Sequence, residues 1–389
     1  MHLYILIISS SLLFIGIILS GFTAKIGVPT LLAFLCLGLM FGNGGKYDFT
    51  YDYPDLTFNL AQVALCMILF AGGLNTDFKT IKPVIRQGLV LSTFGVLIST
   101  FICGCLIYVC GILNWSQSFL LGAIISSTDA AAVFSILETK QLRLKENISP
   151  VLELESGTND PVAYFLTVTL TFFIKDGQLD AFQVFFSFLY NMSVGVLLGM
   201  LIGYFSHLIL KGIKLNTGQK PVLIVSVIIF SFSLSEIIHV NSFLAVYIAG
   251  ITLGNLKLNV SYIGNYFQQI SWLMEIFLFT ILGLQVFIQD LPAVVIPGII
   301  VSLILIFVAR PVAVFLGLSI FQCSWKKKLY ISWVGLRGAT PIVFALIPVI
   351  YAIPSAKVLF NIAFFVVIFS ISIQGMTLGV LARFLKITH

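Results

Sequence analysis

The sequence predicts an all-α integral membrane protein. Three features point to this fold class: the composition, the long apolar runs and the uneven distribution of positive charge. Of the 389 residues, 59% are hydrophobic and only 9% are charged, whereas a soluble domain carries about 25% charged residues. The apolar runs are continuous and lack the alternation of a transmembrane β-barrel. Because a bilayer admits only helices and closed barrels, the runs are predicted to be helices.

Counting the apolar runs between polar segments gives about thirteen transmembrane helices, some of them short or interrupted. An odd number fits two inverted six-helix repeats, spans 1–6 and 8–13, joined by span 7. The short second run and the break near Asn241 leave twelve or fourteen spans as alternatives. No soluble domain or low-complexity tail is visible, so we expect a single membrane domain over residues 1–389. The runs lie at 3–20, 28–42, 56–74, 83–111, 117–138, 151–174, 181–210, 220–239, 242–256, 265–288, 292–320, 327–350 and 356–385.

The distribution of Lys and Arg tests this span count, because loops inside the cell carry an excess of positive charge. With the N-terminus outside, sixteen of the 21 Lys and Arg residues fall in inside segments. Lys46, Lys175 and Lys357 fall outside, and Arg310 and Arg337 lie within spans. The bias favours thirteen spans with the N-terminus outside and the C-terminus in the cytoplasm.

The remaining composition argues against several classes of protein. The first run, at 3–20, has no positive segment before it, which disfavours a cleaved signal peptide. The six cysteines show no paired spacing typical of a zinc site, so we interpret them as small hydrophobic residues and expect no cofactor and no metal beyond an alkali cation. The net charge of +6 comes from the inside loops. We therefore expect membrane lipid as a partner and no nucleic acid.

Eight ionisable residues fall within the predicted spans. Each costs about 3 kcal/mol or more at the bilayer centre unless it is paired or hydrated. They are therefore expected to have a partner or a function. The eight are Asp129, Glu153, Glu155, Asp160, Glu236, Glu275, Arg310 and Arg337.

The first polar stretch, 126–132 (SSTDAAA), interrupts span 5. Hydroxyls and a carboxylate can satisfy the backbone groups of an unwound helix, and they are hard oxygen ligands that suit Na⁺ or K⁺. We expect Asp129 to cap the broken half-helix rather than to carry an ion. A polar contact between helices, with the hydroxyls bonded to backbone carbonyls, is the alternative.

The second polar stretch, 153–161 (ELESGTNDP), leads into span 6. Pro161 removes a backbone donor and is expected to loosen the helix, and Gly157 allows another chain to approach closely. Asp160 would then lie beside exposed carbonyls. Because desolvation favours the neutral forms of a carboxylate, protons and cations would compete for it there. For Glu153, a role as a helix cap at the cytoplasmic end is an equally favoured interpretation.

Four segments resemble the signature stretches of the monovalent cation:proton antiporter-1 family. Within this family the chain is most similar to the NhaP-type potassium/proton, cell-volume-regulation branch, and the similarity runs over essentially the whole chain. Members of that branch continue into a cytoplasmic regulatory domain, which we expect this chain to lack. The segments are 128–133 (TDAAAV), 155–163 (ESGTNDPVA), 309–311 (ARP) and 335–341 (GLRGATP).

The resemblance implies an ion site shared by spans 5 and 6, in an NhaA/NhaP-like fold with broken crossing helices. Asp160 would alternately hold the cation and the proton, with Thr128 and Ser156 as oxygen ligands. Asn159 would steady the unwound crossing through hydrogen bonds. The resemblance also implies a homodimer in the inner (plasma) membrane.

The resemblance further implies an ion pair between Glu155 and Arg310 that ties the two repeats together. Each charge would offset the burial of the other. Arg337, in the matching break of span 12, would neutralise nearby carboxylates or carbonyl ends, with no partner assigned.

Three other residues within the spans receive weaker interpretations. Glu236 and His239 share a face of span 8, where a structural pair near the membrane edge is favoured over an access funnel or a pH sensor. Glu275 is a candidate for the funnel or for a dimer contact. The Lys326–Lys328 run is interpreted as a topology anchor.

Together these features predict a secondary antiporter that exchanges K⁺ or Na⁺ for H⁺ electroneutrally, because a single carboxylate binds either ion but not both. The K⁺ preference rests on the branch resemblance alone. A passive cation channel and, less favoured, an intramembrane enzyme are the alternatives; the four histidines lack the spacing that an enzyme would need. Residues 83–174 and 292–386 would form a moving core. Residues 1–82 and 220–288 would form the scaffold, with a linker span at 181–210.

Overall fold

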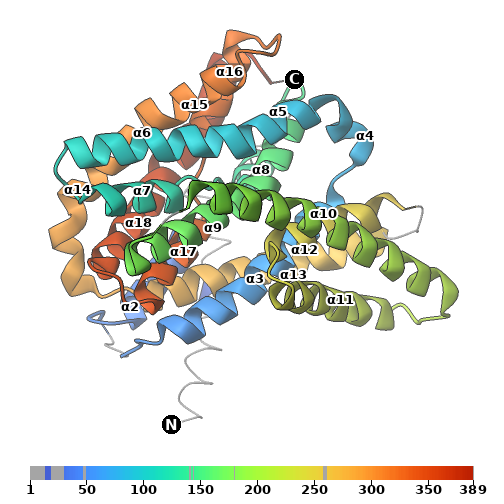
Figure 1. Ribbon diagram of the computed structural model, residues 1–389. Helices are drawn as coiled ribbons and strands as arrows, with labels where there is room; N and C mark the ends of the chain where they lie inside the picture. Colours follow the sequence, from blue (N-terminus) through green and yellow to red (C-terminus); the bar gives the residue numbers. More distant parts are fainter. Residues whose placement is uncertain are drawn as a thin grey trace.

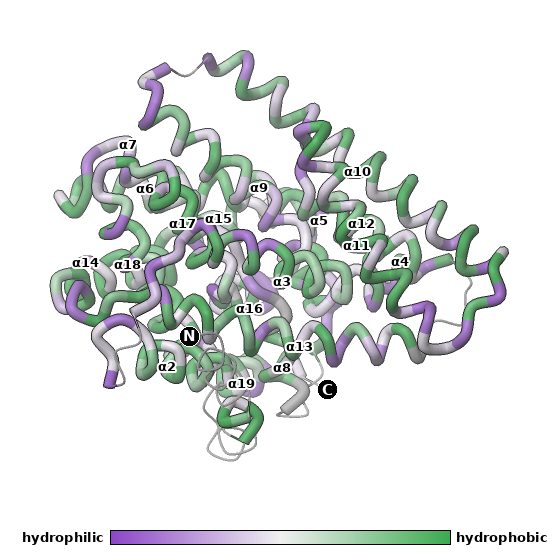
Figure 2. The backbone as a smooth tube through the Cα atoms, turned by 90° about the horizontal axis from the view of Figure 1, so that it is seen from below, coloured by the Kyte–Doolittle hydropathy of each residue, from purple (hydrophilic) through white to green (hydrophobic). Residues whose placement is uncertain are grey.

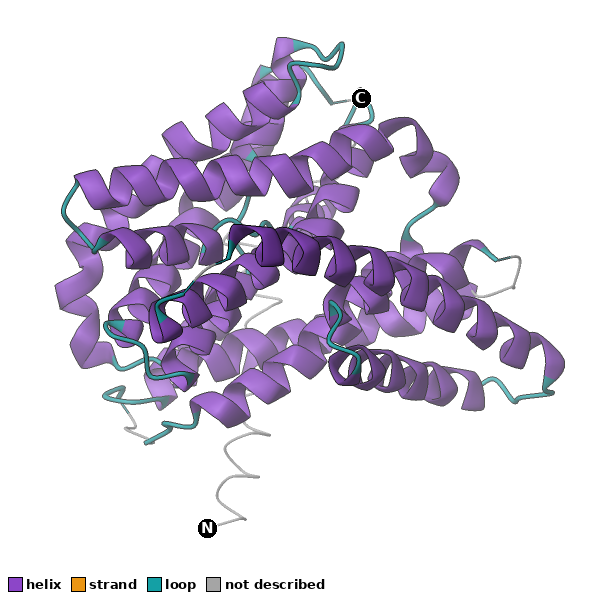
Figure 3. Ribbon diagram, in the orientation of Figure 1, coloured by secondary structure: helices purple, strands orange, loops and turns teal. Residues whose placement is uncertain are grey.

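The computed structural model describes residues 14–18, 30–46, 50–139, 142, 144–178, 180–256 and 261–388. Figure 3 shows that helices make up nearly all of the described chain. Within it, the strand-like pairing recorded is one isolated bridge between Leu144 and Thr388. The all-α prediction is confirmed.

The helices fall into two groups by their packing, and most of them can be followed by their labels in Figure 1. In the first group α12 packs between α3 and α10, and α13 packs against α2 and α3. In the second, α7 packs against α6 and α9, and α18 packs against α14 and α17. The first group consists of α2 (Thr30–Phe41), α3 (Pro54–Asn75), α10 (Ala181–Gly212), α11 (Gln219–Ile237), α12 (Ser242–Asn255) and α13 (Ser261–Leu284).

The second group contains the polar stretches singled out in the sequence. It follows the short helix α4 (Phe78–Ile81) and takes in both predicted broken spans. Its helices are α5 (Ile85–Val90), α6 (Val96–Val109), α7 (Trp115–Ile124), α8 (Ala130–Thr139), α9 (Ile148–Asp176), α14 (Leu291–Ile304), α15 (Arg310–Gly317), α16 (Trp325–Trp333), α17 (Thr340–Ile350), α18 (Ala356–Ser370) and α19 (Met376–Phe384).

Every predicted span from the second onward coincides with a helix or with consecutive helices. The first, 3–20, lies outside the described residues except for 14–18. Among the described residues, seven helical stretches are long and apolar enough to cross a membrane, and α2, α12 and α17 are shorter apolar helices. Spans 5 and 12 are not among these seven stretches, because each is divided into two shorter helices. Figure 2 shows that most helical segments are hydrophobic, while much of the hydrophilic colour lies in the turns between them.

Large apolar side chains cover the outer face of α10. Phe182, Phe185 and Phe205 are exposed there, as are many Leu and Ile residues on neighbouring helices. Such a surface would be unfavourable in water but suits contact with lipid tails. Several of the buried polar residues, among them Ser127, Asp160 and Arg337, lie in the interior where broken helices meet.

Spans 4 and 11 each contain one π-helical turn. These turns lie at Leu91–Gly95 and Leu305–Ala309, and π-turns inside helices are found mostly at functional sites. A third lies at Ile371–Gly375, in span 13. The third turn has no counterpart in span 6, where α9 is continuous.

Candidate functional site

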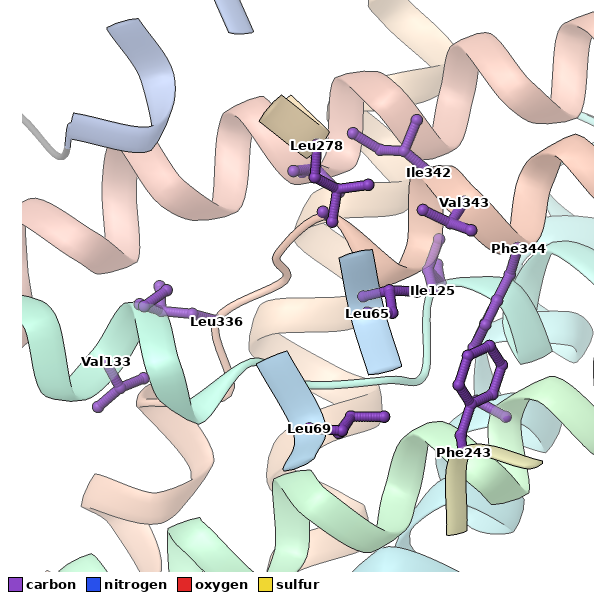
Figure 4. Packing of buried hydrophobic residues seen from close by; sticks show 14 of the residues in the cluster. Leu65, Leu69, Ile125, Val133, Phe243, Leu278, Leu336, Ile342, Val343 and Phe344 are labelled. Atoms are coloured by element: carbon purple, nitrogen blue, oxygen red, sulfur yellow. The ribbon is translucent and has the colours of Figure 1, made fainter. Parts of the chain in front are cut away.

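Two interrupted spans cross in the interior of the protein. α7 ends at Ile124 and α8 begins at Ala130, while α16 ends at Trp333 and α17 begins at Thr340. The non-helical stretches between them meet, because the backbone N–H of Asp129 donates to the carbonyl of Leu336 at 2.8 Å. Figure 4 shows the apolar side chains that surround these stretches. The breaks in spans 5 and 12 are therefore a single structural feature.

Local chemistry explains why the first break forms. Ser, Thr and Asp side chains compete with the helix for backbone hydrogen bonds, so a run of them favours an interruption. Asp129 accepts a hydrogen bond from the backbone N–H of Ala132 at 3.1 Å and so caps α8, as the sequence predicted. In the opposite break, a Cβ on Gly338 would collide with the Asp129 carboxylate. Only a glycine lets the two stretches come this close.

Arg337 binds the backbone carbonyls that follow the end of α7, where the first break begins. Its Nη1 donates to the carbonyls of Ser126 at 2.7 Å and Ser127 at 2.6 Å, and its side chain is only 1% exposed. Carbonyls at a helix C-terminus carry partial negative charge. Arg337 therefore neutralises the end of α7, which supplies the partner that the sequence left open.

Asp160 lies on α9 beside this crossing and is 6% exposed. Ser127 donates a hydrogen bond to one carboxylate oxygen, and Thr340 donates to the other at 3.3 Å. Each interrupted span thus supplies one hydroxyl to the same carboxylate. Sequence reasoning missed Ser127 and Thr340 as site residues, although both stand inside the polar stretches that marked the breaks.

Hydrogen bonds join the predicted ligands Thr128, Ser156 and Asn159 to one another, and Asn159 directly precedes Asp160 in the chain. The Asn159 amide nitrogen donates to the Thr128 hydroxyl at 2.5 Å, and the Ser156 hydroxyl donates to the Thr128 carbonyl at 2.9 Å. The Asn159 amide oxygen is buried and has no hydrogen-bond partner among the described residues. These contacts hold α9 against the first break and leave one amide oxygen available.

The expected loosening of the helix at Pro161 is wrong. α9 runs unbroken from Ile148 to Asp176 with Pro161 inside it. The Pro161 carbonyl accepts from the Asn241 side chain at 3.0 Å. A single missing donor does not unwind a helix that its neighbours support on all sides. The groups that contact Asp160 are hydroxyls of the crossing instead.

Gly157 marks the close approach that the sequence predicted. A Cβ at this position would collide with the ring of Tyr247, which belongs to α12. The contact therefore joins α9, which carries Asp160, to the other group of helices.

Glu155 and Arg310 are brought together, both of them buried. Arg310 Nη1 donates to one oxygen of Glu155, and Nη2 lies 3.0 Å from the other. Nη2 also lies 3.3 Å from the carbonyl of Ile331. Because α9 and α15 belong to different repeats, this bidentate pair links the two halves of the chain.

A cavity of about 870 Å³ reaches Asp160 between the two groups of helices. Of the described residues that line it, four carry carboxylates, namely Asp129, Glu153, Asp160 and Glu275, and none is a Lys, Arg or His. The lining includes the last residue of α3, Asn75. The cavity therefore extends toward the membrane face that carries the lysines just after α3, and it can concentrate cations.

Glu236 and His239 lie away from this cavity. Glu236 accepts from the Ser242 hydroxyl at 2.7 Å, and His239 has a positive φ of 54° in the turn between α11 and α12. The partner of the Glu236 carboxylate is thus Ser242 and not His239, so the predicted structural pair between these two described residues is wrong. The described residues contain no group of three or more His, Cys, Asp or Glu side chains that could hold a metal ion.

These features define a class of polytopic membrane protein, in which two broken helices cross beside a buried carboxylate. The chain matches the family described as "Sodium/hydrogen exchanger, transmembrane" over residues 10–384. The chain therefore belongs to the sodium/hydrogen exchanger family. The predicted family is confirmed.

The fold is similar to the solved sodium proton antiporter MjNhaP1 from Methanocaldococcus jannaschii at pH 8. The TM-score is 0.85 at 24% identity, with 98% of this chain and 99% of that one covered. At this level of identity the likeness shows the fold.

Relatives with closer sequences are potassium/proton antiporters by name. The K(+)/H(+) antiporter NhaP of Alkalimonas amylolytica is 36% identical over 97% of this chain. NhaP2 of Shewanella baltica (strain OS223) is 36% identical over 98%. The chain spans 66% of the length of each of these two relatives. The Na(+)/H(+) antiporter 1 of M. jannaschii is 26% identical over 86% of this chain.

Proposed function

We propose that this chain is a secondary antiporter that exchanges K⁺, or else Na⁺, for H⁺ across the membrane. One observation carries the proposal: a buried carboxylate, Asp160, receives one hydroxyl from each of two crossed broken helices and faces a cavity free of basic residues. Hydroxyl, carbonyl and amide oxygens around a carboxylate suit a partly dehydrated alkali cation. The named activities of the relatives support the same class of reaction.

The exchange is one for one and electroneutral. Asp160 is neutral with either a proton or a cation bound, so replacing one by the other moves no net charge. Asn159 adds no second titratable group beside it. The empty carboxylate is charged, and a buried charge is costly to move through the bilayer. Leak by the empty carrier is therefore suppressed.

The ligands of the cation are Asp160, Thr128, Ser156 and the amide oxygen of Asn159. Arg337, Asp129 and the Glu155–Arg310 pair hold the crossing in shape. K⁺ is preferred as substrate because the 36% identical relatives are potassium/proton antiporters by name, whereas the sodium/proton antiporter is 26% identical.

The core, residues 83–174 and 292–386, moves against a scaffold of residues 1–82 and 220–288, with a linker span at 181–210. The cavity lies between these two bodies, and their contact at Gly157 and Tyr247 supports the division. The protein is a transporter and not an enzyme, and it acts as a homodimer through its scaffold. It lies in the plasma membrane with the N-terminus outside, so the cavity opens to the cytoplasm.

Reconstitution into proteoliposomes that contain a pH dye tests the proposal. Adding K⁺ or Na⁺ outside should drive proton movement that an imposed membrane potential does not change. Asp160→Asn should abolish it. Asp176→Asn is the matched control, because it makes the same change at the exposed end of the same helix and should leave exchange intact. Full activity in Asp160→Asn would refute the site. Voltage-dependent exchange would refute the one-for-one scheme, and a current without proton coupling would indicate a channel.

A further inference from the structure

One face of α13 forms a wall of the cavity that leads to Asp160. Its lining residues recur at the three- and four-residue spacing of a single helical face. The wall is polar near the start of α13 and apolar near its end, and Glu275 is the last polar residue before the apolar part. The residues of this wall are Asn265, Gln268, Gln269, Ser271, Trp272, Glu275, Leu278 and Phe279.

Three of the four cavity carboxylates have a role within the protein. Asp160 accepts the two hydroxyls of the crossing, Asp129 caps α8, and Glu153 accepts a hydrogen bond from Thr76. Glu275 is the exception. No hydrogen bond or ion pair joins it to any part of the chain that the structure describes. A carboxylate in this position is either neutral or solvated by water or by a cation within the cavity.

The position of Glu275 brings it close to the path of the ion. Leu278, one helical turn further along α13, lines the same cavity as Ala339 and Thr340 at the end of the second break. Glu275 lines this cavity too, on the wall that the scaffold contributes. Asp160 belongs to α9 on the core side of the same cavity.

We propose that Glu275 is a second cation-binding carboxylate, which holds hydrated K⁺ or Na⁺ on the scaffold wall before the ion reaches Asp160. The inference rests on the proposed exchange function and adds a recruitment site to it. Because α13 belongs to the scaffold, Glu275 is not carried along with Asp160. Its charge therefore leaves the stoichiometry and the electroneutrality of exchange unchanged, but it raises the local concentration of cations.

Glu275→Gln is expected to raise the KM for the cation roughly three- to tenfold, as expected for one charge acting across a hydrated cavity. The maximal rate should stay within about twofold, since the exchange carboxylate is intact. The increase should be seen in everted membrane vesicles, whose outer solution faces the cavity in the proposed orientation. In right-side-out vesicles the KM should change little.

Three further variants separate charge from structure. Glu275→Asp keeps the charge and should have the KM of the wild type within about twofold. Gln269→Glu, on the same wall, should partly restore the KM of Glu275→Gln. Glu236→Gln removes an exposed carboxylate outside the cavity and should change nothing. If the Glu275→Gln protein does not elute as a single species, Gln269→Lys is tested instead. This variant places a positive charge on the same wall and should raise the KM for the cation although Glu275 is retained.

An unchanged KM in Glu275→Gln would overturn the inference. So would an equal rise on both sides of the membrane, or a complete loss of exchange. These results differ from a failure of the proposed function, in which the wild type itself shows no cation-driven proton movement. In that case both proposals fall.

Discussion

Ser127 and Thr340 each place a hydroxyl on the Asp160 carboxylate, and these contacts define the chemistry of the site. Thr340→Ala should raise the KM for the cation about fivefold, because one hydrogen bond contributes about 1 kcal/mol. Thr340→Ser keeps the hydroxyl and should remain near the wild-type value. Cation titrations of exchange in proteoliposomes provide the measurement, and equal KM values for Ala and Ser would contradict the assignment.

The Glu155–Arg310 pair is buried, so removing one partner strands the other charge. Arg310→Met should lower stability by about 3–5 kcal/mol, the cost of an uncompensated buried charge. Thermal unfolding in detergent should show a clear drop in the melting temperature. The double variant Glu155→Leu with Arg310→Met leaves no stranded charge and should recover much of the loss. No recovery in the double variant would indicate that the pair does more than balance charge.

At this scale the sequence predicted which residues carry chemistry better than it predicted their contacts. Asp160, Asn159, Glu155 and Arg310 stand out because polar residues in an apolar span are costly. Thr340 could not be assigned, since its contact with Asp160 joins positions 180 residues apart. Such a contact depends on how two repeats cross, which no local pattern contains.

Among the helices, α9 and α12 approach closely where Gly157 faces Tyr247. Gly157→Ala should slow exchange about tenfold, since a methyl group forced into a packed contact costs ~1–3 kcal/mol. Adding Tyr247→Ala should restore part of the rate by making room. Gly72→Ala is the matched control, because Gly72 also lines the cavity but a Cβ there meets nothing within 4 Å. A similar loss in both single variants would point to a general effect of helix stiffness.

The unbroken course of α9 makes a second prediction for this element. Pro161→Ala should leave the melting temperature unchanged or raise it, because proline is the poorest residue for a helix interior. Exchange should be retained, since the two hydroxyls on the Asp160 carboxylate come from other segments. Loss of exchange with intact folding would instead revive the idea of a loosened helix at Pro161.

The elements themselves were largely predictable. Apolar runs separated by polar loops predicted the boundaries of the described spans, and clusters of Ser, Thr, Asp and Gly predicted the breaks in spans 5 and 12. The continuity of α9 was not predictable, because the effect of a proline depends on whether neighbours such as Asn241 support the backbone around it. No pattern in the sequence predicted the π-helical turns.

Across the whole molecule, the proposed motion requires the core to separate from the scaffold. Thr76, just after α3, donates a hydrogen bond to Glu153 of α9, so this contact joins the two bodies at one end of the cavity. Cysteines at both positions, in a background without the six native cysteines, should be joined by a short bifunctional thiol reagent. Cross-linking should stop exchange, and each single cysteine variant with the same reagent should remain active. Full exchange after complete cross-linking would rule out the motion.

The hydrogen bond between the Asp129 N–H and the Leu336 carbonyl ties together two interruptions that are about half the chain apart. Their lengths are therefore interdependent. Inserting one residue into either interruption would displace the arginine from the carbonyls it covers and turn the adjoining half-helix by about 100°. A compensating change would have to arise in the opposite repeat. The spacing of each interruption is thus a constraint that one half of the chain imposes on the other, and engineered chimeras should exchange both interruptions together.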